Sequence, residues 1–109
     1  MWDPSALTED DIDEMVHSVE QPGGTAAILE MYRARQLDAE QNRPHYADPL
    51  RCPVLAVGAQ AYLGDEVRQQ LTQVASNVHG VVITDSGHNI ALENPAALAR
   101  AYLDFFAGH

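Results

Sequence analysis

The stretch that decides the fold is VVITDSGHNIALENPAALARAYLDFF, which runs from Val81 to Phe106. It begins with a short apolar run typical of a buried strand, continues through a turn that carries His88, and ends in an apolar helix. A loop that follows a buried strand is a common place for a general base, because the strand end fixes where the side chain points. The stretch therefore predicts strand, loop and helix, with His88 as the candidate catalytic base. A purely structural role for this histidine is the alternative.

Length and composition point to one small globular unit. The chain has 109 residues, 46% hydrophobic and 20% charged, which favours a packed core over disorder. A net charge of -10 argues against nucleic-acid binding, which relies on clustered Lys and Arg. No run approaches the roughly 20 apolar residues of a membrane span, and the N-terminus lacks a signal-peptide pattern. We therefore expect a cytoplasmic protein that contacts neither nucleic acid nor membrane.

Cysteine and histidine usage predicts neither a disulfide nor a metal site. Cys52 is the single cysteine, and it precedes a proline at a strand entrance, where we expect a small buried apolar residue. The chain has no glycine-rich phosphate loop, so no cofactor is expected. The remaining histidines share no ligand spacing on one element; they are His17, His45, His79 and His109.

The region before Val81 predicts a second strand and a helix. Val54 to Val57 is a continuous apolar run between a proline and a glycine, as expected for a strand buried on both faces of a parallel sheet. A helix should begin at Gly64 or Asp65. Its apolar positions at helical spacing are Val67, Leu71, Val74, Ala75 and Val78.

The region after His88 predicts the final helix. Asn94 is the expected N-cap, and Pro95 occupies the first helical position, where a missing N–H has no cost. The back half of the chain is therefore expected to be β-α-β-loop-α. The inner stripe of the final helix is predicted to be Leu98, Ala101, Tyr102 and Phe105.

The front half predicts helices. Residues 1–7 are expected to be a linker, and Thr8 to be an N-cap with Asp11 in the capping-box position. A Gln-Pro-Gly-Gly stretch should end this helix, whose apolar stripe is Ile12, Met15, Val16 and Val19. A second helix is expected over residues 25–37, followed by a fraying helix end and a loop over residues 38–50. The buried side of this helix is predicted to be Ala27, Ile28, Met31 and Tyr32.

Two separate motifs carry a resemblance to a known family. The segment Pro53 to Gly58, together with Gly87-His88-x4-Glu93-x-Pro95 and the apolar last helix, is similar to the C-terminal end of α/β-hydrolases. The most similar branch contains epoxide hydrolases and haloalkane or fluoroacetate dehalogenases. The resemblance implies an α/β fold in which these two parallel strands are the penultimate and last of a larger sheet. It also implies that His88 is the general base.

The front half resembles the end of the helical cap of epoxide hydrolases, through its acidic helix and the sequence Met31-Tyr32-Arg33-Ala34. The resemblance implies that residues 1–49 are a cap remnant and residues 50–109 the end of the hydrolase core. It also implies that Tyr32 donates a hydrogen bond to the epoxide oxygen, as a neutral phenol can. By helical spacing alone, Tyr32 would be a core residue.

The sequence departs from the family pattern at the nucleophile and at the histidine-orienting acid. It contains no Gly-x-Ser-x-Gly or Gly-x-Asp-x-Gly elbow, and the oxyanion-hole loop is also missing. Ala61 stands where many members carry the acid, and Asn89 replaces an aromatic residue often found after the histidine. Asp65, expected at a helix start, is the candidate acid in this chain. An acid after an earlier strand, outside the chain, is the alternative.

The sequence therefore predicts part of an epoxide-hydrolase-like enzyme that is inactive alone, because a histidine base without a nucleophile cannot perform the two-step ester chemistry. A small-molecule substrate would bind only if another chain or segment supplied the missing nucleophile. The alternatives are a fragment of a dehalogenase or serine esterase, or a non-catalytic interaction module derived from the same fold. A strand edge without its neighbour offers unpaired backbone groups. We therefore expect self-association or a partner chain at that edge.

Overall fold

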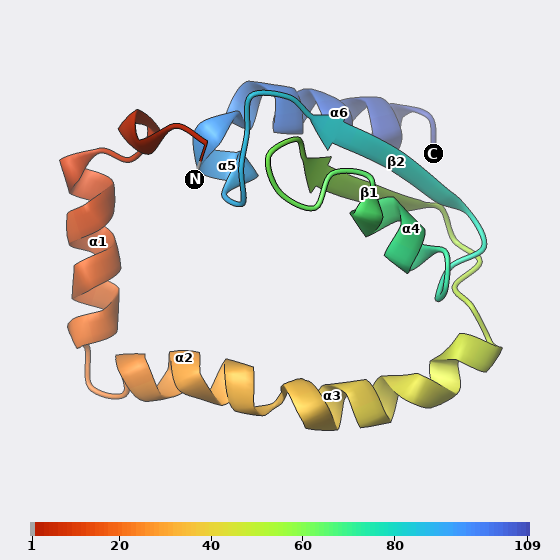
Figure 1. The fold of residues 1–109 in the computed structure, drawn as a ribbon, viewed down its shortest axis with the longest axis horizontal. Coiled ribbons are helices and arrows are strands. Elements are labelled where there is room, and N and C mark those ends of the chain that lie inside the picture. Colours follow the sequence, from red (N-terminus) through yellow and green to blue (C-terminus); the bar gives the residue numbers. More distant parts are fainter. Residues whose placement is uncertain (1) are drawn as a thin grey trace. The chain divides into compact units, whose positions relative to one another are not determined.

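The computed structural model describes residues 2–109, which form two compact units (Figure 1). The larger unit contains the N-terminal residues through Ala6 together with Ala47–His109, and the smaller unit is Leu7–Tyr46. The first residue of the predicted linker lies outside the described part. The linker prediction is wrong for the residues that follow, because Pro4–Ala6 forms a 3-10 turn that belongs to the larger unit.

The larger unit is built on two parallel strands. Strand β1 is Val54–Ala59 and strand β2 is Val78–Ile83, and their register runs from Val54 opposite Val78 to Ala59 opposite Ile83. The predicted α/β fold with two parallel strands is confirmed. Both strands are longer than the apolar runs that predicted them, since pairing with a neighbour extends a strand through residues with weaker propensity.

Helices lie on both faces of this sheet (Figure 1). The face that carries Leu55 and Val81 is covered by α6, which is Pro95–Ala107. Helix α4, Glu66–Leu71, lies on the opposite face. A side chain in place of Gly80 would point at α4, because its Cβ would lie 2.5 Å from the Arg68 Cδ. Gly80 thus permits close packing of helix on strand.

The core of the larger unit is small. The apolar residues that are almost fully buried are Ala56, Ala59, Ala75 and Ile83. Two burial predictions are wrong, since Cys52 is exposed and Tyr102 of α6 is 46% exposed. Both side chains lie where the two strands and two helices provide no further layer to cover them.

Helix α4 is shorter than predicted. It ends at Leu71, Val74 and Ala75 follow in a turn and an isolated bridge, and Val78 begins β2. The helical spacing of these apolar residues is therefore misleading. Residues that pack in the core are apolar whether they lie in a helix, a turn or a strand, so their spacing alone did not show where the helix ends. The predicted cap of α6 is confirmed, since the Asn94 side chain accepts a hydrogen bond from the Ala97 N–H and Pro95 begins the helix.

The smaller unit begins with α1, Glu9–Glu20, which starts as predicted. The Thr8 hydroxyl accepts from the Asp11 N–H at 3.2 Å, while the Asp11 carboxylate accepts from the Thr8 N–H at 2.9 Å. These reciprocal bonds form the capping box. The helix ends before Gly23, whose φ of 83° lies in the left-handed region that favours glycine.

The rest of the smaller unit differs from prediction. The second helix divides into α2, Gly24–Arg33, and α3, Arg35–Asn42, and a 3-10 helix over Arg43–Ala47 replaces most of the predicted loop. The predicted buried side of α2 is also wrong. Its residues Ala27, Ile28, Met31 and Tyr32 are all exposed, because no layer within Leu7–Tyr46 covers them.

Residues 2–109 contain no helix with the length and apolar character needed to cross a membrane.

Candidate functional site

The carboxyl ends of β1 and β2 lie side by side, and the loops that follow them are bonded together. The Gln60 N–H donates to the Ile83 carbonyl at 2.9 Å, and the Ala61 N–H donates to the Ser86 carbonyl at 3.1 Å. The first loop turns back sharply, since a Cβ on Gly58 would lie 1.8 Å from a backbone oxygen in the next turn. Because parallel strands end at one edge, side chains from both loops can meet there.

The loop that carries His88 is fixed by its polar neighbours. Ser86 is completely buried, and its hydroxyl donates to the Ile83 carbonyl at 3.0 Å. Asp85 has a φ of 50°, an uncommon value for a residue with a side chain, and its N–H donates to the Gln60 side chain at 3.1 Å. The chain then enters α5, Ile90–Glu93, a short helix that the sequence did not predict. The histidine therefore follows the strand through a well-defined turn.

The His88 side chain is exposed and packs against Tyr62. The two ring centroids lie 4.6 Å apart, with the ring planes at 64°, in an edge-to-face arrangement. Within residues 2–109, no hydrogen bond reaches the imidazole of His88. Its nitrogens are therefore free to bind a water or a substrate, as a general base requires.

Tyr62 was not singled out from the sequence. The available signal was its place beside Ala61 in the turn after β1, next to the loop after β2. Glu93 was recognised only as part of the family motif. In the structure its carboxylate accepts hydrogen bonds from the backbone on both sides of His88, at Gly87 and Asn89.

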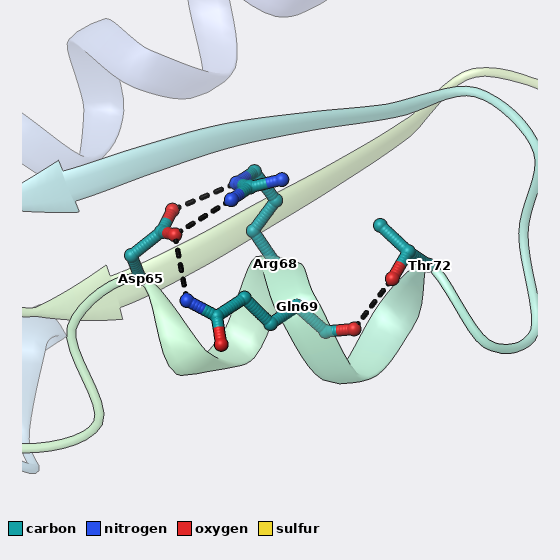
Figure 2. A network of polar contacts seen from close by, with 4 residues as sticks. All are labelled: Asp65, Arg68, Gln69 and Thr72. Carbon is teal, nitrogen blue, oxygen red and sulfur yellow. Dashed lines mark hydrogen bonds and ion pairs between the residues drawn. The ribbon is translucent and has the colours of Figure 1, made fainter.

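Asp65, the candidate acid, is bound by other side chains (Figure 2). The Arg68 guanidinium donates to both of its carboxylate oxygens, at 2.8 and 2.7 Å, and the Gln69 amide donates at 3.2 Å. These contacts replace the predicted helix cap, since the Asp65 side chain makes no capping bond to α4. The hydrogen bonds from Arg68, followed by that from Gln69, lower the pKa of Asp65 to about 2. No hydrogen bond joins Asp65 to His88 within the described residues.

Replacing Asp65 by asparagine should leave the NMR signals of the His88 ring unchanged, because the side chains that bind the Asp65 carboxylate are those of Arg68 and Gln69.

The same replacement should change how the stability depends on pH. The pKa of Asp65 is lowered from about 3.8 in the unfolded chain to about 2 in the folded chain. Its ionised carboxylate therefore stabilises the fold at pH values above about 3.8, and this stabilisation is lost as the pH falls through about 2. The free energy of unfolding, measured by urea titration at several pH values, should not show this loss of stability at acidic pH in the Asp65→Asn variant. The matched control is Asp48→Asn, which removes another exposed i,i+3 ion pair. A shift of the His88 signals in the Asp65 variant alone would identify Asp65 as the orienting acid.

Tyr32 lies on α2, in the smaller unit, and its side chain is 66% exposed. Neighbouring Met31 is also exposed. The adjacent Arg33 forms an ion pair with Glu30 on the same helix. Tyr32 is thus available for contact with a ligand or with another layer of protein.

Comparison with known proteins assigns the fold. The chain is 31% identical over 106 residues to a soluble epoxide hydrolase from Corynebacterium sp. strain C12, and the match covers 97% of this chain and 37% of that enzyme. The chain has the fold of the C-terminal portion of an α/β-hydrolase. No family model matches it.

Two solved structures support the same assignment. The chain superimposes on Cfl2 from Burkholderia cenocepacia with a TM-score of 0.91 and 37% identity, covering 96% of this chain and 36% of Cfl2. It superimposes on the ligand-free epoxide hydrolase CorEH with a TM-score of 0.89 and 31% identity, covering 98% of this chain and 38% of CorEH. It therefore spans little more than a third of the length of the relatives that it matches.

Proposed function

We propose that this chain supplies the general-base histidine, His88, of an epoxide-hydrolase-like hydrolase whose nucleophile lies on a segment that this sequence does not contain. The observation that carries the proposal is the similarity to epoxide hydrolases over nearly the whole chain. The exposed imidazole at the carboxyl end of β2 supports it, because its nitrogens have no other hydrogen-bond partner among residues 2–109.

The proposed chemistry has two steps. An aspartate of the missing segment attacks an epoxide carbon and breaks its bond to oxygen, which forms an ester and an alkoxide that takes up a proton. The imidazole of His88 then takes a proton from water, and the resulting hydroxide attacks the ester carbonyl. The acyl C–O bond breaks, and the departing alkoxide takes the proton back from the imidazolium, which gives the diol. The aspartic acid that remains releases a proton to water, which regenerates the carboxylate and balances the proton taken up in the first step.

Tyr32 is proposed as the donor to the opening epoxide oxygen. A phenol is neutral at pH 7 and donates well to a developing alkoxide. Its exposure on α2 supports a role outside a packed core. The helices of residues 1–49 would be the end of a cap, and residues 50–109 the end of the catalytic core. Asp65 is not part of the proposal, because Arg68 and Gln69 bind its carboxylate.

The test is a chimera in which this chain replaces the matching segment of the Corynebacterium epoxide hydrolase. The chimera should hydrolyse an epoxide, while this chain alone should turn over neither an epoxide nor a p-nitrophenyl ester. A haloalkane tested in parallel would reveal the dehalogenase alternative. A folded chimera without hydrolysis, or His88-dependent turnover by this chain alone, would overturn the proposal.

A cytoplasmic location is proposed for the enzyme.

The free edge of β1 favours a second candidate, a non-catalytic module that self-associates. Within the described residues, β1 pairs only with β2. Apolar side chains at the end of α6 are also exposed, including Leu103 and Phe106, each at 71%. An unpaired strand edge beside apolar surface is typical of an association site.

Light scattering over a wide concentration range tests this module. If the chain self-associates, it should form a defined oligomer whose stability His88→Ala does not change. Substituting proline for Leu55 on β1 should abolish the oligomer by blocking strand addition. A chain that remains monomeric at all concentrations would exclude the module.

A further inference from the structure

Glu93 accepts four backbone hydrogen bonds at the end of α5. One carboxylate oxygen, Oε2, accepts from the Gly87 N–H at 3.1 Å and from the Asn89 N–H at 3.2 Å. The other, Oε1, accepts from the Asp3 N–H at 3.1 Å and from the Trp2 N–H. A single side chain therefore joins the N-terminal segment to the loop after β2.

The two donors to Oε2 belong to the residues on either side of His88. The Asn89 N–H lies in the peptide group between His88 and Asn89, and the Gly87 N–H lies in the peptide group between Ser86 and Gly87. The two hydrogen bonds therefore restrain the loop backbone on both sides of the His88 Cα atom, from which the side chain leaves. No hydrogen bond reaches the imidazole itself among residues 2–109, and Tyr62 contacts it only through the ring edge. The backbone therefore restrains where the His88 side chain begins, while the imidazole itself packs against Tyr62.

The carboxylate of Glu93 is suited to this arrangement because its partners are all donors. Partial burial raises its pKa, but the hydrogen bonds from Asp3, Trp2, Gly87 and Asn89 outweigh that effect, so the pKa is lowered from its ordinary value. An ionised carboxylate makes stronger hydrogen bonds than a neutral group.

We propose that Glu93 is a positioning residue that orients His88 through the backbone N–H groups of the residues before and after it, and that the same carboxylate anchors the segment at Trp2 and Asp3 to this loop. The catalytic meaning of that orientation rests on the proposed function of His88, whereas the contacts themselves do not. Removing the carboxylate should therefore loosen the loop whether or not the chain takes part in hydrolysis.

The test is Glu93→Gln in the intact chain, with Glu66→Gln on α4 as the matched control. Glutamine keeps the shape but replaces one accepting oxygen with an NH₂ group, which cannot accept from two N–H donors. Amide exchange at Gly87 and Asn89 should accelerate by about tenfold or more, because hydrogen bonds to a charged group are lost. The His88 ring signals should also shift. Both readouts should stay unchanged in the control.

A wild-type measurement covers the case in which the variant fails to fold. Scalar couplings across hydrogen bonds should connect the amide nitrogens of Gly87 and Asn89 to the carboxyl carbon of Glu93. Absence of these couplings, or a folded glutamine variant with unchanged exchange and unchanged His88 signals, would overturn the proposal.

The chimera separates this inference from the proposed function. If both are right, Glu93→Gln lowers kcat and KM together in the chimera and leaves kcat/KM nearly unchanged, because the base acts only in hydrolysis of the ester and not in its formation. If the chimera is inactive while the NMR effects occur, the positioning role stands and the hydrolase proposal fails. An active chimera with no NMR effect would refute the positioning role alone.

Discussion

His88→Ala is expected to lower epoxide turnover by the chimera about 10²- to 10⁴-fold, which is the usual contribution of a general base. The imidazole is exposed at the end of β2 and has no competing hydrogen-bond partner among residues 2–109. Its loss should block hydrolysis of the ester without blocking its formation. Mass spectrometry of the variant after brief exposure to an epoxide should therefore detect a covalent adduct that the unmodified chimera does not accumulate.

The matched control is His79→Ala. This histidine lies near the start of β2, and its ring packs against His109 at 4.9 Å and Phe105 at 5.9 Å, at the opposite end of the strand from His88. Turnover should change by about twofold at most, since surface substitutions away from a site have small effects. If both histidine variants lose activity equally, or if His88→Ala keeps activity within tenfold, His88 is not the base.

Ile83→Ala is expected to destabilise the larger unit by about 2–5 kcal/mol, the usual cost of truncating a buried isoleucine. Ile83 is 4% exposed, and the other almost fully buried apolar residues are alanines. Domains are stable by only about 5–15 kcal/mol, and small ones lie at the lower end. The variant should therefore lose most of its cooperative urea transition, followed by far-ultraviolet circular dichroism.

Val82→Ala is the control on the same strand. Val82 is 41% exposed, so its truncation leaves no cavity and should cost about 0.5 kcal/mol. A comparable loss of stability in both variants would mean that strand propensity, and not burial, determines the effect. An Ile83 variant as stable as the wild type would mean that the two-stranded unit does not depend on this core.

Several elements of the fold could be predicted from the sequence because their causes are local. The capping box of Thr8 and Asp11 needs only residues three apart, and the Asn94-Pro95 helix start is equally local. The apolar runs of β1 and β2 indicated two parallel strands, and the turn after the second run placed His88. These features were predicted correctly because hydrogen bonding and burial act within a few neighbouring residues. Burial of the second strand was predicted less well, since Ile83 is the one residue of β2 that is almost fully buried.

The rest depended on contacts between distant parts of the chain. Val78 has the spacing of the preceding helix, yet it begins β2 because it pairs with Val54. The apolar stripe of α2 indicates a face that can be buried, but no layer within Leu7–Tyr46 covers it. An amphipathic pattern predicts a face and not the element that packs on it.

The candidate site also combines features that the local sequence predicts with contacts between distant parts of the chain. The sequence by itself determined that His88 follows an apolar strand, because the apolar run and the turn are consecutive. Only the tertiary structure brought Tyr62 to the edge of its ring and placed Trp2 and Asp3 against Glu93. Tyr62 and His88 meet because the carboxyl ends of two parallel strands lie side by side, whatever the number of residues between them. Trp2 and Asp3 lie against Glu93 because its carboxylate accepts hydrogen bonds from their N–H groups.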